Sequence, residues 1–290
     1  MTESTDPGPP APLPFLGLLR AEGPDAASFL QGQLTNDVRL LADGRTQLAA
    51  LNTPQGRVVA LLRLREQEGA VYALLPADLV DKVVTLLRRY VLRAKVRLEP
   101  AAGVVMTWCD SAAPPGAPAS SPITFQYAPG RIVVATPGPA AGIADVAAGP
   151  THARSPQQDW MAADIAAGLP QVFSATSEAF IPQMLNLDLL DGVSFSKGCY
   201  TGQEIVVRTQ HLGRIKRRTL RYRVASGPPP APLDGLFHDG QKAADVLMSA
   251  RVGDAVELLA VTQLEARHLS LALADGRVAT PVDLPYAVPA

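Results

Sequence analysis

The chain has 290 residues, of which 47% are hydrophobic and 18% charged, and its formal net charge is -1. This composition is that of a globular protein with one large core or two to three smaller ones, and it excludes disordered, coiled-coil and collagen-like chains. No apolar run reaches the roughly 20 residues of a bilayer-spanning helix, and no basic segment followed by an apolar one opens the chain, so we expect neither membrane insertion nor secretion.

The N-terminal part of the chain predicts an extension followed by an α+β subdomain. Residues 1–14 hold five prolines and no apolar periodicity, so we expect a disordered extension there. Residues 15–110 form the predicted first subdomain, with strands at 15–20, 46–52, 57–65, 70–75, 95–99 and 104–109 and helices from Asp25 to about 35–37 and at 78–92. Asp37 is therefore expected where a helix gives way to a loop.

The central part predicts a second α+β subdomain behind a proline-rich linker. Residues 111–122 carry four prolines and a glycine, which is typical of a surface linker. Residues 123–213 form the predicted second subdomain, with a hairpin of strands 125–127 and 131–136 and a helix at 157–167 that ends at Gly168 and Pro170.

The C-terminal part, residues 214–290, predicts a small β-barrel or β-sandwich. Short strand-like runs separated by Gly, Pro and Asp lie at 219–225, 241–249, 255–259 and 278–284. The whole chain is thus α+β with an all-β C-terminal part.

The most informative segment runs from Ser194 to Arg208. Gly198 and Gly202 allow a tight or left-handed backbone, and a helix is expected at 203–210, so several backbone N–H groups can converge at the helix start. With Lys197 alongside, such a nest suits a carboxylate or a phosphate.

Cysteine use fits a reducing cytoplasm. The two cysteines, Cys109 and Cys199, form no Cys-x-x-Cys pair, so we expect no disulfide framework. Cys199 has two readings. Beside Lys197 and the nest, its thiol pKa would be lowered, which favours a reactive thiolate, whereas a lone Cys is more often a small buried residue. Cys109, inside an apolar strand, is assigned to packing.

Other site classes are disfavoured. The four histidines are scattered without metal-ligand spacing, so we expect no metal site built from this chain alone. Neither a phosphate-binding P-loop nor a Gly-x-Gly-x-x-Gly following a strand is present, which argues against nucleotide-binding enzymes.

The octet Lys197-Gly-Cys-Tyr-Thr-Gly-Gln-Glu204 resembles the signature of the YgfZ family, whose members are relatives of the glycine-cleavage aminomethyltransferase. The resemblance covers most of residues 15–225 and includes the segments 29–38, 168–170, 180–188 and 213–218.

This resemblance implies a fold of two related α+β halves around a central folate pocket, completed by a C-terminal β-barrel. It implies a tetrahydrofolate-binding protein that supports assembly or repair of iron-sulfur enzymes, including tRNA-modifying ones, with folate and iron-sulfur client enzymes or assembly factors as partners. Cys199 is then the functional thiol and Lys197 its neighbour. The candidate cofactor-binding residues are Asn36, Asp37, Gln183, Asn186, Gly198, Tyr200, Gly202, Gln203, Glu204 and Arg208.

Two departures from the aminomethyltransferase pattern argue against a conventional enzyme. Val59 and Ala60 stand where the transferases carry paired aspartates, and Ala166 stands where they carry the glutamate that recognises the pterin. Aliphatic side chains can neither transfer a proton nor stabilise a developing iminium charge. A folate-dependent aminomethyltransferase or demethylase with a relocated base remains the alternative.

Aromatic and basic residues near the signature admit several readings. Trp160, Phe180 and Phe195 either pack against the faces of a pterin or belong to the core. The stretch from Arg208 to Arg223 contains seven Arg and Lys residues and no acid. It is a solvated surface, a site for the polyglutamate tail of folate, or a contact for tRNA phosphates, although a pI near 6.4 disfavours a dedicated nucleic-acid binder.

Overall fold

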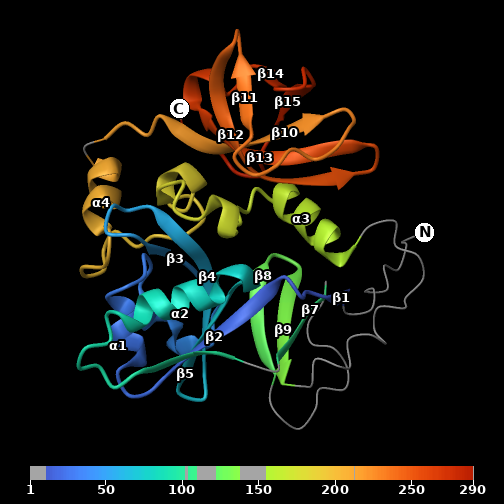
Figure 1. Ribbon diagram of the computed structural model, residues 1–290. Coiled ribbons are helices and arrows are strands. Elements are labelled where there is room, and N and C mark those ends of the chain that lie inside the picture. Colours follow the sequence, from blue (N-terminus) through green and yellow to red (C-terminus); the bar gives the residue numbers. More distant parts are fainter. Residues whose placement is uncertain (1–10, 102–103, 110–121, 138–154, 212, 290) are drawn as a thin grey trace. The chain divides into compact units, whose positions relative to one another are not determined.

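The computed structural model of the chain (Figure 1) describes residues 11–101, 104–109, 122–137, 155–211 and 213–289. The chain divides into two compact units that interleave in sequence. Unit 1 comprises 1–31, 38–49 and 62–156, and unit 2 comprises 32–37, 50–61 and 157–290. The linear subdomain bounds expected from the sequence stay predictions.

A five-stranded sheet in the order β3-β4-β5-β2-β6 supplies most strands of the N-terminal half. Its strands are β2 (Leu16–Glu22), β3 (Gln47–Asn52), β4 (Val58–Gln67), β5 (Ala70–Pro76) and β6 (Arg97–Pro100). The helical elements are α1 (Ala26–Gln31), η1 (Val38–Asp43), η2 (Ala77–Leu79) and α2 (Val80–Arg88). Aliphatic residues of α2 repeat at helical spacing and are buried, which explains why this helix packs beside β2 and β6.

A second sheet in unit 1 has the order β1-β7-β9-β8. It consists of β1 (Ala11–Pro12), β7 (Val104–Cys109), β8 (Ile123–Ala128) and β9 (Arg131–Pro137). The predicted strand at 104–109 and the predicted hairpin are confirmed. Apart from Pro122, the predicted linker lies outside the described residues.

Two predictions in this half need correction. Order begins before Phe15, because β1 pairs with β7 and the Leu13 side chain is buried; residues 1–10 lie outside the described part. The first helix ends at Gln31 rather than near Asp37. Leu34 forms a β-bridge with Leu51, and this long-range pairing overrides the helical apolar spacing.

Unit 2 contains short helices and a closed six-stranded barrel. The helices are α3 (Pro156–Ala166), η4 (Ser174–Thr176), η5 (Pro182–Leu185), α4 (Gln203–His211) and η6 (Leu264–Ala266). The barrel strands, in the order β10-β13-β12-β11-β14-β15, are β10 (Arg217–Val224), β11 (Gly235–His238), β12 (Gln241–Val252), β13 (Ala255–Gln263), β14 (Leu271–Leu273) and β15 (Val278–Val282).

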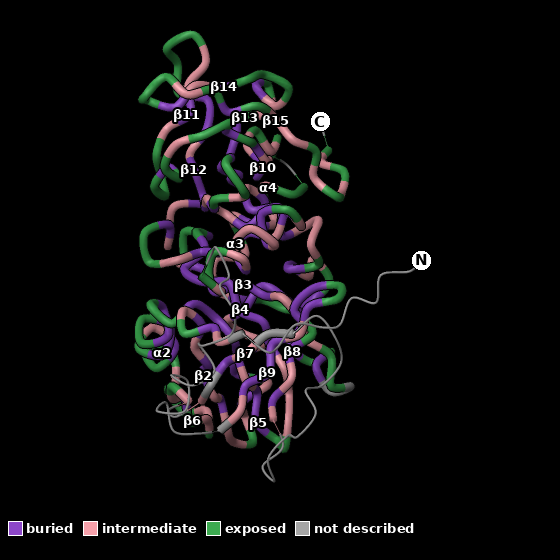
Figure 2. The backbone as a smooth tube through the Cα atoms, turned by 90° about the vertical axis from the view of Figure 1, so that its right-hand side faces the viewer, coloured by how far each residue is buried: buried purple, intermediate pink, exposed green. Residues whose placement is uncertain are grey.

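The barrel encloses its own apolar core. Long buried stretches of β12 and β13 (Figure 2) surround Tyr222 of β10, and β15 pairs with β10 to close the ring. The C-terminal part is therefore a β-barrel and not a β-sandwich. Among the helices of the described ranges, none is long and apolar enough to cross a membrane.

Candidate functional site

The signature loop exposes Cys199 between two buried side chains, those of Lys197 and Tyr200. Cys199 and Gly198 are exposed, whereas the side chains of Lys197 and Tyr200 are buried. The reading of Cys199 as a small buried residue is therefore wrong, since its thiol faces solvent. Burial raises the pKa of Tyr200 to about 12, so its phenol stays protonated at a pH where an exposed tyrosine loses its proton.

The Lys197 ammonium is engaged by backbone oxygens. Nζ donates to the carbonyl oxygens of Leu34 at 2.6 Å and Asn36 at 2.9 Å, and it lies 5.0 Å from the centroid of the Tyr200 ring. The side chain is only 6% exposed. A buried ammonium is stabilised by strong acceptors of this kind. Activation of Cys199 by Lys197 stays a prediction.

Residues 191–201 hold residues 33–36 along their whole length, and we call these two stretches together the clamp. Besides those of Lys197, the clamp bonds run from Thr35 Oγ1 to Gly192 O at 2.7 Å, from Asn36 Nδ2 to Asp191 O at 2.7 Å, from Ser194 N to Thr35 O at 3.0 Å, and from Thr201 Oγ1 to Gln33 Oε1 at 3.1 Å. Cys199 stands between two of the anchoring residues, Lys197 and Thr201.

The residues at the end of the clamped segment, Asn36 and Asp37, are 4% and 9% exposed. Asn36 Oδ1 accepts a hydrogen bond from the Asp37 nitrogen at 2.9 Å. On the other side, Thr35 exchanges two bonds with Ala50 of β3, donating its nitrogen to Ala50 O at 3.0 Å and accepting at Oγ1 from Ala50 N at 2.8 Å. The segment is thus fixed from both sides.

The two signature glycines have different roles. Gly202 has φ +78°, and a Cβ there would lie 2.4 Å from the carbonyl oxygen of Thr53 in the turn before β4. Gly56 of the same turn has φ +72° and approaches Gly202 closely. Gly198, in contrast, has no positive φ and open space around its Cβ position, so of the tight or left-handed backbone that a glycine allows there, the left-handed form is not adopted.

The predicted helix after the signature is confirmed as α4, and the loop lies along it. At the helix start, Gln203 Oε1 accepts a hydrogen bond from the Tyr200 backbone nitrogen at 3.2 Å. At the helix end, the rings of Phe195 and His211 meet edge-on, with 6.1 Å between their centroids. Glu204 and Arg208 are exposed on the helix.

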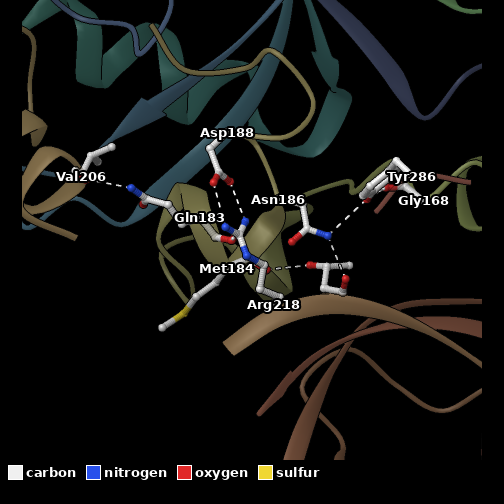
Figure 3. A network of polar contacts seen from close by, with 9 residues as sticks. Gly168, Gln183, Met184, Asn186, Asp188, Val206, Arg218 and Tyr286 are labelled. Atoms are coloured by element: carbon white, nitrogen blue, oxygen red, sulfur yellow. Dashed lines mark hydrogen bonds and ion pairs between the residues drawn. The ribbon is translucent and has the colours of Figure 1, made fainter. Parts of the chain in front are cut away.

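Gln183 and Asn186 lie in a buried polar network around η5 (Figure 3). Gln183 Nε2 donates to Val206 O of α4 at 2.7 Å. Asn186, with φ +58°, donates from Nδ2 to Thr219 O of β10 at 2.8 Å and to Tyr286 Oη at 3.2 Å. Both amide nitrogens therefore bind the protein itself, and only the side-chain oxygens have no partner among the described residues.

The Arg218–Asp188 ion pair and Tyr286 complete this network (Figure 3). Arg218 of β10 binds both carboxylate oxygens of Asp188, at 2.7 and 2.8 Å, and donates to Gln183 O at 3.1 Å. Tyr286 Oη donates to Gly168 O at 2.7 Å. Burial raises the pKa of Tyr286, which favours the protonated phenol that donates this bond.

The positions that depart from the paired aspartates of the aminomethyltransferases are buried in the structure. Val59 and Ala60 are fully buried in β4, and the Val59 oxygen accepts from Ser177 Oγ at 2.8 Å. Trp160 and Phe180 are buried, which favours the core reading for both, whereas Phe195 is half-buried against His211.

The basic stretch is partly neutralised. Arg217, Arg218 and Arg221 of β10 pair with Asp245, Asp188 and Glu257. The remaining four, Arg208, Arg214, Lys216 and Arg223, are exposed and form no ion pair within the described ranges. Of the seven basic residues in this stretch, only these four present a positive charge without an ion-pair partner among the described residues. The described residues likewise bring no three His, Cys, Asp or Glu side chains together as a metal site.

Sequence reasoning missed several residues that build this site. Thr35 and Thr201 hold the clamp, and Asn52, which is buried next to the 53–56 turn, has no partner for either side-chain polar atom in the described part of the chain. Only the polar type of Asn52 at the end of an apolar strand signals a special position. The clamp threonines carry no such signal, because their partners lie more than 150 positions away.

Comparison with known proteins identifies relatives of the chain. No protein-family model matches the chain. The tRNA-modifying protein YgfZ of Klebsiella pneumoniae strain 342 is 34% identical over 219 residues, which are 69% of this chain and 67% of that protein. The tRNA-modifying protein YgfZ of Sodalis glossinidius strain morsitans is 30% identical over 238 residues, which are 76% and 72% of the two chains.

A solved structure establishes the fold. The crystal structure of glycine cleavage system aminomethyltransferase T from Bartonella henselae superposes with a TM-score of 0.75 at 16% identity, over 96% of this chain and 86% of that one. The predicted α+β, aminomethyltransferase-like fold with a C-terminal β-barrel is confirmed.

Proposed function

Since the chain belongs to the YgfZ family, we propose that it is a tetrahydrofolate-binding protein that supports assembly or repair of iron-sulfur enzymes, including enzymes that modify tRNA. Cys199 is its chemical centre. The cytoplasm, where thiols stay reduced, is the compartment in which such a protein works.

The observation that carries this proposal is the exposed thiol on an anchored loop. Cys199 faces solvent, and the loop on both sides of it is bonded to residues 33–36. A thiol that serves only packing would be buried. A reactive or ligating thiol needs access and a fixed position, and the clamp supplies both.

The residues of unit 2 are suited to a pterin ring. Polar side-chain atoms of Asn52, Gln183, Asn186 and Tyr200 are buried with no partner in the described part of the chain. Buried polar groups are stable when paired, and the edge of a pterin presents amide-like donors and acceptors. Asp37 adds a carboxylate at the end of the clamped segment. When bound, tetrahydrofolate supplies one-carbon or reducing chemistry.

Cys199 acts in this proposal by ligating iron from a client. As a thiolate it provides one ligand for a labile cluster iron and releases its proton to solvent. Iron-sulfur clusters usually need about four protein ligands, so a client enzyme or assembly factor supplies the others. A direct contact with tRNA, through the four exposed cations, is the less favoured partner.

The alternative function is a folate-dependent one-carbon enzyme. The buried aliphatic side chains of Val59 and Ala60 favour the first proposal, because no carboxylate stands at these positions to move a proton. Incubation with tetrahydrofolate and methylated amines distinguishes the two: formation of methyl-tetrahydrofolate, with the methyl group moving from the amine nitrogen to the folate nitrogen and a proton returning to the amine, would support the enzyme.

The direct test is calorimetric titration of tetrahydrofolate into anaerobic, reduced protein and its Asp37→Ala and Cys199→Ser variants. We expect saturable binding that is lost in Asp37→Ala and kept in Cys199→Ser. Cys199→Ser is expected to abolish support of an iron-sulfur reporter enzyme in cells that lack the protein. Absence of binding up to millimolar tetrahydrofolate would refute the folate assignment, and full support by Cys199→Ser would refute the role of the thiol.

A further inference from the structure

We infer that the turn after α2, residues 88–97, is a docking surface for a protein partner whose contact site is an apolar pocket bordered by Asp and Glu side chains. The whole turn belongs to unit 1, whereas the signature loop belongs to unit 2. The inference therefore depends neither on folate nor on the Cys199 thiol. It goes beyond the proposed function, which names partners but no surface that binds them.

Two large apolar side chains of the turn face solvent. Leu92 is 88% exposed, more than any other large hydrophobic residue in the described part of the chain, and Tyr90 is 38% exposed. The apolar side chains of the preceding helix, such as Val83 and Leu87, are buried instead. Single exposed hydrophobic residues are common on protein surfaces. The significance of Leu92 therefore depends on what holds it and what surrounds it.

The turn is fixed at both ends, so it presents Leu92 in a defined position. At the helix end, the Arg88 guanidinium donates from Nε to Leu98 O of β6 at 3.0 Å. At the other end, the Lys95 backbone nitrogen donates to Asp25 Oδ2 at 2.7 Å. A surface that is already ordered before binding loses little conformational entropy when a partner covers it. The exposed leucine is thus a preformed contact and not the tip of a loose loop.

The charges around Leu92 are of one sign. Residues 82–98 contain six Arg and Lys residues and no Asp or Glu. Arg97 pairs with Glu99. Four cations of the turn are exposed and form no ion pair within the described ranges, namely Arg88, Arg89, Arg93 and Lys95. Such a field attracts an acidic surface and repels a basic one.

The apolar side chains at the centre of this field favour a protein over RNA. Surfaces that bind single-stranded RNA stack its bases on exposed aromatic rings or guanidinium planes. Leu92 has no π face, and Tyr90, the one aromatic residue of the turn, is largely covered. Tyr and Arg are enriched where proteins meet. An apolar pocket accepts the leucine, and carboxylates around that pocket pair with the four cations.

The test places the photo-crosslinking amino acid p-benzoylphenylalanine at position 92 of the full chain, in the cells that naturally make the protein. The same probe at Val278 is the control, because this residue of β15 is also apolar and 54% exposed, while the neighbouring Arg277 is neutralised by Asp275. We expect light-dependent adducts with one protein to be about fivefold more abundant with the probe at Leu92. The crosslinked peptide of that protein should be rich in Asp and Glu.

A charge reversal then tests the positive field. Arg93→Glu, combined with the probe at position 92, should reduce the adduct about fivefold, because a negative charge then faces the acidic partner. The matched control is Arg45→Glu, which changes another exposed arginine of unit 1. Arg45 precedes β3, and β3 and β6 lie at opposite edges of the five-stranded sheet, so this variant should leave the adduct unchanged. If Arg93→Glu does not fold, Arg89→Glu takes its place.

The outcomes decide between the possible occupants of the turn. An acid-rich protein adduct that Arg93→Glu reduces and Arg45→Glu does not reduce supports the inference. Adducts that ribonuclease removes assign the turn to RNA and overturn it. Adducts with a second copy of this chain, or adducts no more abundant than with the probe at Val278, also overturn it, and so does a protein adduct that does not respond to the charge reversal. None of these results alters the proposed folate and thiol functions.

Discussion

The buried ion pair between Asp188 and Arg218 joins the segment after η5 to the first barrel strand, and its removal should be costly. The two side chains are 5% and 4% exposed, and the guanidinium forms two bonds with the carboxylate. Asp188→Asn removes the negative charge and one of the two acceptor oxygens, so the Arg218 charge stays buried with only neutral acceptors, the amide oxygen at 188 and the carbonyl oxygen of Gln183. Breaking one side of a buried pair typically costs about 3–5 kcal/mol.

Urea unfolding followed by tryptophan fluorescence, to which the buried Trp160 contributes, measures this cost. The control is Glu22→Gln, which breaks the pair with Arg20, whose side chains are 36% and 45% exposed, and should cost about 0–1 kcal/mol. The double variant Asp188→Leu/Arg218→Met should recover most of the loss, because it removes both charges together. An Asp188→Asn variant no less stable than Glu22→Gln would refute the reasoning.

Three further outcomes are expected. Gly202→Ala should destabilise the protein by about 1–3 kcal/mol, because its φ is positive and the added methyl meets a backbone oxygen, whereas Gly198→Ala should be nearly neutral in thermal unfolding. Burial raises the Tyr200 pKa to about 12, so the native state keeps a proton that the unfolded state loses near pH 10. The free energy of unfolding should therefore fall as the pH rises from about 10 to about 12. Tyr200→Phe should reduce this fall, as measured by denaturation curves at each pH. Arg214→Gln with Lys216→Gln should weaken the binding of polyglutamylated more than monoglutamyl tetrahydrofolate at low salt, and equal weakening would argue against a tail site.

The elements that local patterns control were predictable. The helix after the signature begins where Gly202 ends the loop, and the hairpin of β8 and β9 follows from the turn residues between them. The short barrel strands β11 and β14 were not, because they have only 4 and 3 residues and carry too few positions for a period to be recognised.

Long-range bonds account for what the sequence could not predict at the site. The apolar spacing that extends α1 to Leu34 is real, but Leu34 pairs with β3 instead. Lys197 is close to Cys199 in sequence, yet its ammonium donates hydrogen bonds to residues more than 150 positions earlier. Exposure of Cys199 likewise depends on which neighbours fold over it, and sequence spacing does not report that.

The interleaving of the two units has a consequence for synthesis on the ribosome. Residues 33–36 emerge early, but Lys197 and Thr201, which bond to them, emerge after some 160 further residues. At about 5–20 residues per second this delay is roughly 8–30 s. During that time residues 33–36 lack the bonds that hold them in the folded protein, and a fragment that ends before residue 191 cannot complete unit 2.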